Sequence, residues 1–439
     1  MLKNYIRIEK TKILNSNTII SKLSFSRGVK KYFKSSIFFA KYNVDIQDVD
    51  LSILNIPVIT NILPIAWAIG ADIYVNEIDS AFLNSLADIK VVMKKWYPSF
   101  SFSTNIFATK KVINYFSDEC NALLFSGGLD STCSYIQSKT KKPLLIMIWG
   151  ADIPLNKKTF WMTVQQKYEQ FAKSEKIDFL LIKSNIRDLL DEKKLSFKFG
   201  RYCTDNSWWG SIQHGFSSLG LCAPLTEVKN IGILYISSSW NLHLIKGRQS
   251  WGSHPLIDNK LSWSNIRIIH YGSKYSRQEK IKYILKEYIK KNRIYPTLRV
   301  CYSQFQELNC GACDKCLRTI TGLVLENIDP NECGFNIDNK FFINLKKSFL
   351  KKGPNPLSGD PYGIWKDIQM NIPMDFSSNM YDSKTFFNWF KEFKLIETFD
   401  KKKPQYWTYI VLAKLPENLQ RKISKFISFY KSSFNKKFF

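Results

Sequence analysis

A short apolar run that leads into a glycine-rich loop is the feature that most constrains the fold of this chain. Residues 122–125 read Ala-Leu-Leu-Phe and are followed directly by Ser-Gly-Gly-Leu-Asp-Ser at 126–131, after which 132–137 has the character of a helix. A buried strand, a tight glycine turn and a helix in this order are typical of the first part of a strand–helix–strand unit.

The alternation of strand and helix continues after the loop. Three further apolar runs, at 144–149, 179–182 and 231–236, read as buried strands, and a helical stretch at about 157–173 separates the first two. Strands that alternate with helices favour a parallel sheet with helices on its faces. We therefore predict an α/β fold with a doubly wound parallel sheet.

The chain is longer than this unit. Its 439 residues exceed the ~150 residues that serve as a prior for one domain. We predict an α+β extension over 1–119, the α/β domain over 120–335, and a Lys-rich, aromatic-rich and mainly helical extension over 336–439. The most apolar stretch, 56–75, is interrupted by prolines and a charge, so it falls short of the roughly 20 apolar residues of a membrane span and reads as buried core.

Composition limits the classes of partner. The 45% of hydrophobic residues excludes a disordered chain, and 64 Lys and Arg against 37 Asp and Glu give a formal net charge of +27. Such a charge attracts phosphates, nucleic acid or anionic surfaces, although a general compositional bias is the better explanation. The first residues lack the apolar core of a secretory signal, so we expect a cytoplasmic protein without a membrane partner. A nucleic-acid partner and a homodimer both stay open.

The loop has the chemistry of a phosphate site. Paired glycines let backbone N–H groups turn toward an anion, and the helix that follows presents its positive end. Asp130 is suited to cap that helix or to help hold Mg²⁺. A Walker A loop is excluded because its lysine is absent. The alternative is an ordinary strand-to-helix turn.

The hexapeptide resembles the pyrophosphate loop of the ATP pyrophosphatases, which include asparagine synthetases, GMP and NAD synthetases, tRNA thiolases and 7-cyano-7-deazaguanine synthase. The resemblance implies an adenine nucleotide alpha hydrolase-like fold, cleavage of ATP between its α and β phosphates, and transfer of AMP to a substrate oxygen. It assigns Asp130 and Ser131 to catalysis. The ATP site that it implies consists of Ser126, Gly127, Gly128, Leu129, Asp130 and Ser131.

Four of the nine cysteines form a second motif. Cys301, Cys310, Cys313 and Cys316 lie within sixteen positions, and four thiolates are the ligand number of a closed tetrahedral Zn²⁺ site. Such a site has no open coordination position, so we expect a structural role. An iron–sulfur cluster, a sulfur-transfer pair and unrelated buried thiols are the alternatives.

The order of the two motifs resembles that in 7-cyano-7-deazaguanine synthase, an enzyme of queuosine biosynthesis. The resemblance covers about residues 120–335. It implies adenylation of 7-carboxy-7-deazaguanine, displacement of AMP by ammonia to give an amide, and a second adenylation that gives the nitrile. ATP, Mg²⁺ and Zn²⁺ are the implied cofactors.

Polar residues near the end of the fourth strand favour an acceptor pocket, because ligands bind at the carboxyl ends of parallel strands. We expect His254 to orient a carboxylate or to take a proton from an amine. A surface loop is the alternative, and His214, His243 and His270 are expected to be ordinary hydrogen-bonded residues. The substrate-binding candidates are Ser237, Ser238, Ser253, His254 and Asp258.

Cationic side chains would neutralise the leaving pyrophosphate. Arg318, two positions after the last clustered cysteine, is the first choice and is assigned to catalysis. The other candidates are Lys246, Arg248, Arg267 and Arg277.

Three functions follow from these observations. The first is an ATP-dependent C–N ligase that joins a deazapurine carboxylate to ammonia or an amine. The second keeps the adenylation but uses a protein or another macromolecule as acceptor, as enlarged synthase-like proteins of anti-phage defence suggest; tRNA modification belongs here, although no spacing makes Cys133, Cys203 or Cys222 a thiolase cysteine. The third is a non-catalytic nucleotide-binding module with a basic surface.

Overall fold

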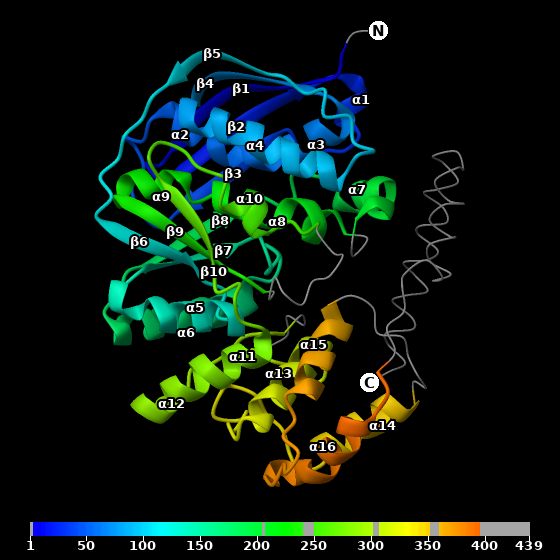
Figure 1. The fold of residues 1–439 in the computed structure, drawn as a ribbon. Coiled ribbons are helices and arrows are strands. Elements are labelled where there is room, and N and C mark those ends of the chain that lie inside the picture. The colour runs from blue at the N-terminus through cyan, green and yellow to red at the C-terminus, as the bar shows by residue number, and fades with distance from the viewer. Residues whose placement is uncertain (1–2, 204–206, 240–249, 302–306, 352–359, 396–439) are drawn as a thin grey trace.

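A central sheet of ten strands organises the molecule (Figure 1). The computed structural model describes residues 3–203, 207–239, 250–301, 307–351 and 360–395. Six of the nine neighbouring strand pairs are parallel, so the predicted α/β class with a mostly parallel sheet is confirmed. The strand order is β10-β9-β6-β7-β8-β3-β2-β1-β4-β5. The strands are β1 (Tyr5–Leu14), β2 (Thr18–Phe25), β3 (Ile37–Tyr42), β4 (Asp72–Asp79), β5 (Ile106–Val112), β6 (Cys120–Leu124), β7 (Leu144–Trp149), β8 (Phe179–Ser184), β9 (Ile231–Ser237) and β10 (Arg267–Tyr271).

Strands β6 to β10 form the parallel half of the sheet, in the order β10-β9-β6-β7-β8. The chain builds outward from β6 to β7 and β8, then returns to the other side of β6 for β9 and β10. The point where the direction of building reverses lies between β6 and β9, and open α/β sheets bind ligands beside the carboxyl ends of the strands at such a point. The loop that follows β6 is therefore at the position where a ligand is expected.

Alternate residues of these strands enter different hydrophobic clusters. Leu123 and Leu145 pack with aromatic side chains of α5 (Leu129–Ser138) and α6 (Lys158–Glu175). Their neighbours Ala122 and Ile146 belong to a second cluster with residues of the helices on the opposite face. Figure 1 shows α5 and α6 on one side of these strands, and α8 (His214–Gly220), α9 (Ala223–Val228) and α10 (Pro255–Asp258) on the other. Burial on both faces explains why the strands are continuously apolar.

Residues 3–119 contribute the other half of the same sheet. β3 pairs antiparallel with β8, with Ala40 opposite Ser184, so the sheet continues across the predicted boundary at 119/120. The three-part division of the chain stays a prediction. The apolar stretch 56–75 contains the whole of α3 (Ile56–Ile69) and enters β4. All residues of α3 except Ile69 are buried, as expected for core. Among the described residues, no helix is long and apolar enough to cross a membrane.

The described part of the C-terminal extension is helical. α14 (Phe341–Lys351), α15 (Asp360–Met370) and α16 (Ser383–Glu392) pack through an aromatic cluster onto the end of α13 (Asp314–Leu325). Trp365 donates its indole N–H to Asp314 Oδ1 at 3.2 Å, which ties this extension to the first turn of α13. The remaining α-helices are α1 (Arg27–Lys30), α2 (Leu51–Leu54), α4 (Ser80–Trp96), α7 (Glu192–Phe199), α11 (Arg277–Lys280) and α12 (Lys286–Asn292).

Candidate functional site

The loop after β6 requires glycine at one position. Gly127 has φ of +75°, a left-handed conformation that other residues rarely adopt. A Cβ on Gly127 would also lie 2.1 Å from the hydroxyl oxygen of Tyr168, which donates to the Gly127 carbonyl at 3.1 Å. Gly128 is the N-cap of α5 and supplies no side-chain cap. The first amides of the helix therefore face the loop without a capping side chain, which is the arrangement that binds phosphate.

Two serine side chains stabilise this loop through hydrogen bonds within it. Ser131 Oγ lies 3.2 Å from Ser126 Oγ and donates to the Gly128 carbonyl at 3.1 Å. Ser126 Oγ in turn lies 3.2 Å from the Gly128 amide, which donates to it. These contacts hold the loop in one conformation, and both hydroxyls line the cavity described below.

Arg299 holds the loop from outside. Its amide donates to the Gly127 carbonyl at 2.7 Å, and its Nε donates to the Ser126 carbonyl at 3.0 Å. Arg299 is 8% exposed and lies two residues before Cys301. The sequence analysis missed this residue, although its place beside the cysteine motif was an available signal.

Asp130 does not cap α5. Its Oδ2 pairs with Arg277 Nη2 at 2.9 Å and its Oδ1 with Lys280 Nζ at 2.9 Å. Burial alone would raise the pKa of the Asp130 carboxyl, but the two cations hold it well below its usual range. Lys280 is 1% exposed and also donates to the carbonyl of Ser238 after β9. Asp130 therefore joins the start of α5 to α11 and to the end of β9.

A cavity of 580 Å³ opens beside the loop, at the carboxyl ends of β6, β7 and β9. Five cationic side chains and two carboxylates line it, so the lining favours an anionic ligand. Four aromatic side chains offer flat surfaces. The charged residues are Arg187, Arg277, Arg299, Lys315, Arg318, Asp130 and Asp152, and the aromatic ones are Phe125, Trp161, Trp209 and Trp251.

Two of the predicted cations reach this cavity. Arg277 and Arg318 line it, and Arg318 is 4% exposed with its Nη1 3.0 Å from Asp314 Oδ2. Arg267 lies exposed on β10 and is not part of the lining. Lys246 and Arg248 lie outside the described residues. Lys315, which the sequence analysis did not select, is one turn before Arg318 on α13, and burial lowers its pKa.

The four predicted cysteines converge on one point. Their sulfur atoms all lie within 4.8 Å of one another, with Cys301 to Cys313 at 3.7 Å and Cys313 to Cys316 at 3.5 Å. Metal–sulfur bonds of about 2.3 Å in a tetrahedron give sulfur–sulfur edges of about 3.8 Å. The cluster can therefore hold a metal ion such as zinc. Cys301 also lines the cavity, so the metal site and the cavity share a wall.

The predicted substrate residues divide into two groups. Ser237 ends β9 and lines the cavity, and its buried hydroxyl has no hydrogen-bond partner within the described part of the chain. Ser238 is buried behind it. The other three candidates surround α10 and are not in the lining: Ser253 Oγ donates to Asp258 at 2.7 Å, Asp258 lies 2.7 Å from His270 Nδ1, and His254 Nδ1 accepts the Leu256 amide at 3.1 Å.

His254 predicts a pH dependence of stability. Desolvation of the half-buried ring, with a smaller effect of the nearby His270, lowers the pKa of His254 to about 4. A lowered native pKa means that the contribution to folding is complete above the unfolded value of about 6.5 and is lost as the pH falls through 4. We expect His254→Asn, which keeps a helix-capping acceptor, to lose less stability than the wild type between pH 7 and pH 4.

Urea unfolding at several pH values measures this difference. Subtracting the wild-type curve from the variant curve removes the contribution of the other titrating groups. Parallel loss of stability in the two proteins would contradict the assignment.

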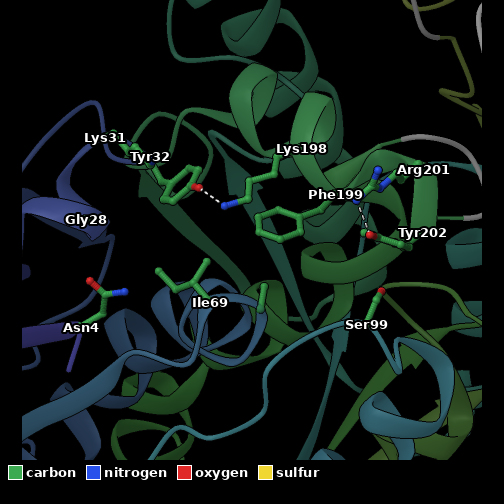
Figure 2. Close-up of a pocket in the computed structure, with 11 residues that line it drawn as sticks. Asn4, Gly28, Lys31, Tyr32, Ile69, Ser99, Lys198, Phe199, Arg201 and Tyr202 are labelled. Atoms are coloured by element: carbon green, nitrogen blue, oxygen red, sulfur yellow. Dashed lines mark hydrogen bonds between the residues drawn. The ribbon is translucent and has the colours of Figure 1, made fainter. Parts of the chain in front are cut away.

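A second cavity, of 430 Å³, lies between the N-terminal half and α7 (Figure 2). Figure 2 shows Lys198 directed at Tyr32, with Nζ 2.5 Å from the phenol oxygen, and Arg201 beside Tyr202. Lys31 also lines it, and no carboxylate is among the described lining residues. The glycine loop, the cysteines and the predicted cations all belong to the other cavity, so the candidate functional site is placed there.

The larger cavity also contains groups that the sequence analysis did not select. Asp152 follows the end of β7 at the same edge of the sheet as the loop, so the rule used for β9 would have found it. His214, the first residue of α8, comes from the opposite face of the sheet and has no comparable local signal in the sequence.

Comparisons with protein families, with curated proteins and with solved structures find no significant match, so the assignment of the site rests on the geometry of this chain.

Proposed function

We propose that this protein is an ATP-dependent C–N ligase that adenylates a carboxylate, releases pyrophosphate and transfers the acyl group to ammonia or an amine. The observation that carries the proposal is the placement of the Ser126–Ser131 loop. It lies at the switch point of the parallel strands and opens into a cavity with five cationic side chains. The resemblance of the loop to that of the ATP pyrophosphatases supports the α–β cleavage.

In this proposal the loop binds the pyrophosphate part of ATP, and the cationic side chains stabilise the charge that develops on it. Backbone amides at the start of α5 would bind the pyrophosphate part of ATP. Arg299 would hold the loop in register through its two hydrogen bonds, while Arg318 and Lys315 face the charge that develops on the leaving pyrophosphate. Their low exposure favours this role, because a cation in a drier environment stabilises developing charge more strongly.

The aromatic lining favours flat ligands. Trp209 and Trp251 line the cavity near Asp152, and Arg187 lies over Trp209 at 4.9 Å from the ring centre. Adenine and a deazapurine carboxylate both carry a planar ring that can stack on such side chains. The unpaired hydroxyl of Ser237 offers a hydrogen bond to one of them.

The residues present also fit the metal ions that the resemblance implies. The spacing of the four sulfur atoms supports Zn²⁺ as the metal of the cysteine cluster. Mg²⁺ would enter with ATP, with phosphate oxygens as its main ligands, and the protein carboxylates that line the cavity are Asp130 and Asp152. Asp130 already pairs with Arg277 and Lys280. Its role here is therefore to position α11 and α5, and not to hold Mg²⁺ by itself.

Pyrophosphate release tests the proposal. Purified protein is incubated with ATP, Mg²⁺ and 7-carboxy-7-deazaguanine, with and without ammonium, and the products are identified by mass spectrometry. We expect release that depends on the carboxylate, with an amide or nitrile product when ammonium is present. Release without a small-molecule product would indicate a macromolecular acceptor. Absence of release and of ATP–pyrophosphate exchange with this and other carboxylates would overturn the enzyme in favour of a nucleotide-binding module.

Gly127→Ala should reduce pyrophosphate release by about 100-fold, because the new methyl group displaces the loop from the buried ring of Tyr168. The left-handed backbone adds a cost of about 1–2 kcal/mol to folding. Steady-state release and thermal unfolding measure the two effects. Gly363→Ala is the matched control, because nothing lies within 4 Å of the added Cβ in α15. Equal activity of Gly127→Ala and the control would contradict the role of the loop.

A further inference from the structure

We propose that His214 is the general base of the second half-reaction, taking a proton from the amine as it attacks the adenylated carboxylate. The inference rests on the proposed ligase function and deepens it. His214 lines the same cavity as the loop, and it is the lining side chain whose ordinary pKa lies nearest to neutrality. The sequence analysis had placed the catalytic histidine at His254, which is outside this lining.

The protein fixes the position of His214 on both sides. The next residue, Gly215, donates its amide to the Gly252 carbonyl at 2.7 Å, and a Cβ on Gly215 would lie 2.5 Å from the Cβ of Ser253. The start of α8 is thus in close contact with the segment that leads to α10. The His214 ring meets Trp209 edge-on, with ring centres 5.4 Å apart. Ser253 and its hydrogen-bond partner Asp258 therefore belong to the support of α8 and not to the cavity wall.

The transfer of the acyl group from AMP to the amine needs a base. An amine nitrogen that attacks the adenylated carboxyl carbon forms a C–N bond, and the bond from that carbon to the AMP oxygen breaks. The nitrogen must then lose a proton to become a neutral amide, while AMP leaves with the electron pair of the broken bond. A neutral imidazole accepts that proton and passes it to solvent, so no other reactant is required.

The surroundings of His214 favour this use. Burial lowers the pKa of His214, so the imidazole is neutral at pH 7 and can accept a proton. The carboxylates of Asp152 and Asp258 favour the imidazolium that then forms, and the cations of Lys315 and Arg187 oppose it. α3, which packs on α8, contains no titratable side chain. The His214 imidazole can therefore accept a proton from the amine and then release it to solvent.

Other lining groups suit the task less well. The guanidinium groups of the four lining arginines do not lose a proton in proteins. Burial lowers the pKa of Lys315, but from an ordinary value far above that of histidine. Asp130 is paired with Arg277 and Lys280, which lowers its basicity. Asp152 is a carboxylate whose pKa is lowered: burial alone would raise it, but the charges of His214, Lys315, Arg299 and Arg187 outweigh that effect, so it is a weaker base than the imidazole. Its charge instead stabilises protonated His214.

His214→Gln separates the two half-reactions. ATP–pyrophosphate exchange with 7-carboxy-7-deazaguanine reports adenylation, and we expect it to stay within about 3-fold of the wild type. Amide formation with ammonium should fall by about 100-fold or more. At a constant concentration of free ammonia, the wild-type rate of amide formation should drop toward acid pH as the imidazole is protonated, and the variant should lose that limb. His254→Asn, a histidine change outside the lining, is the matched control.

A nucleophile that depends less on a base gives the decisive comparison. Hydroxylamine is mostly unprotonated at neutral pH and is more nucleophilic than ammonia, so the loss of rate in His214→Gln relative to the wild type should be much smaller with hydroxylamine than with ammonium. An equal loss with both nucleophiles would indicate a merely structural role and overturn the inference, as would unchanged amide formation. Absence of exchange and of pyrophosphate release in the wild type would instead overturn the proposed ligase, which the exchange assay distinguishes from failure of His214 alone.

Discussion

Asp130→Ala should abolish pyrophosphate release and lower the free energy of unfolding by about 3–5 kcal/mol, the range seen when one partner of a buried ion pair is removed. The substitution leaves Lys280, which is 1% exposed, and Arg277 without their shared counter-charge. It also releases the start of α5 from α11 and from the end of β9. Urea unfolding and the pyrophosphate assay measure the two losses.

The pH dependence gives the prediction a second readout. The pKa of Asp130 is lowered in the native protein, so its contribution to stability is complete above the unfolded value of about 3.9 and is lost as the pH falls below it. Asp130→Asn should therefore unfold more easily than the wild type at pH 7, and the difference should shrink below about pH 4.

Asp178→Asn is the matched control for charge removal. Asp178 is 58% exposed and pairs with Lys229 at 3.2 Å, so its loss should cost less than about 1 kcal/mol and leave pyrophosphate release unchanged. Equal destabilisation by the two asparagine variants would show that the Arg277–Asp130–Lys280 cluster contributes no more than a surface pair.

The parts of this protein that could be predicted from the sequence are those with a local signature. The run at 144–149 coincides with β7 because a strand covered on both faces must be continuously apolar. The loop was recognisable because Gly127 needs a left-handed backbone that few residues adopt. The four cysteines were recognisable because a tetrahedral metal site requires close ligand spacing.

The parts that could not be predicted depend on residues that are far apart in the chain. The pairing of β3 with β8 joins positions 40 and 184, and neither strand carries a mark of its partner. Arg299 reaches the loop across 173 positions of the chain, from the segment that leads to the cysteine cluster. His254 was selected for its neighbours in the sequence, whereas its ring caps α10 and the cavity receives His214 from another helix.

The cysteine cluster should prove to be the support on which the cavity depends. Three of the five cations that line the cavity are attached to it: Arg299 lies two residues before Cys301, while Lys315 and Arg318 flank Cys316 on α13. Binding of structural zinc to zinc-finger peptides releases about 10–16 kcal/mol, as much as the whole stability of a typical domain. Loss of the metal should therefore release the loop as well as the cysteines.

Cys316→Ser is the variant that tests this dependence. A serine hydroxyl stays protonated and is a poor zinc ligand, and because Cys316 is fully buried, a water molecule cannot easily take the place of its thiolate. We expect bound zinc, measured by elemental analysis, to fall from about one per chain to near zero, the melting temperature to drop, and ATP–pyrophosphate exchange to be lost. Cys120→Ser is the control, since Cys120 lies at the start of β6, outside the cluster, and a serine hydroxyl can replace its contact with the Lys229 carbonyl. Retention of exchange at the wild-type KM after zinc is lost would show that Arg299, Lys315 and Arg318 are held by the helices alone. Loss of exchange in Cys316→Ser with full activity in the control would show that the metal organises the cavity wall on both sides, at Arg299 and at Lys315 and Arg318 on α13.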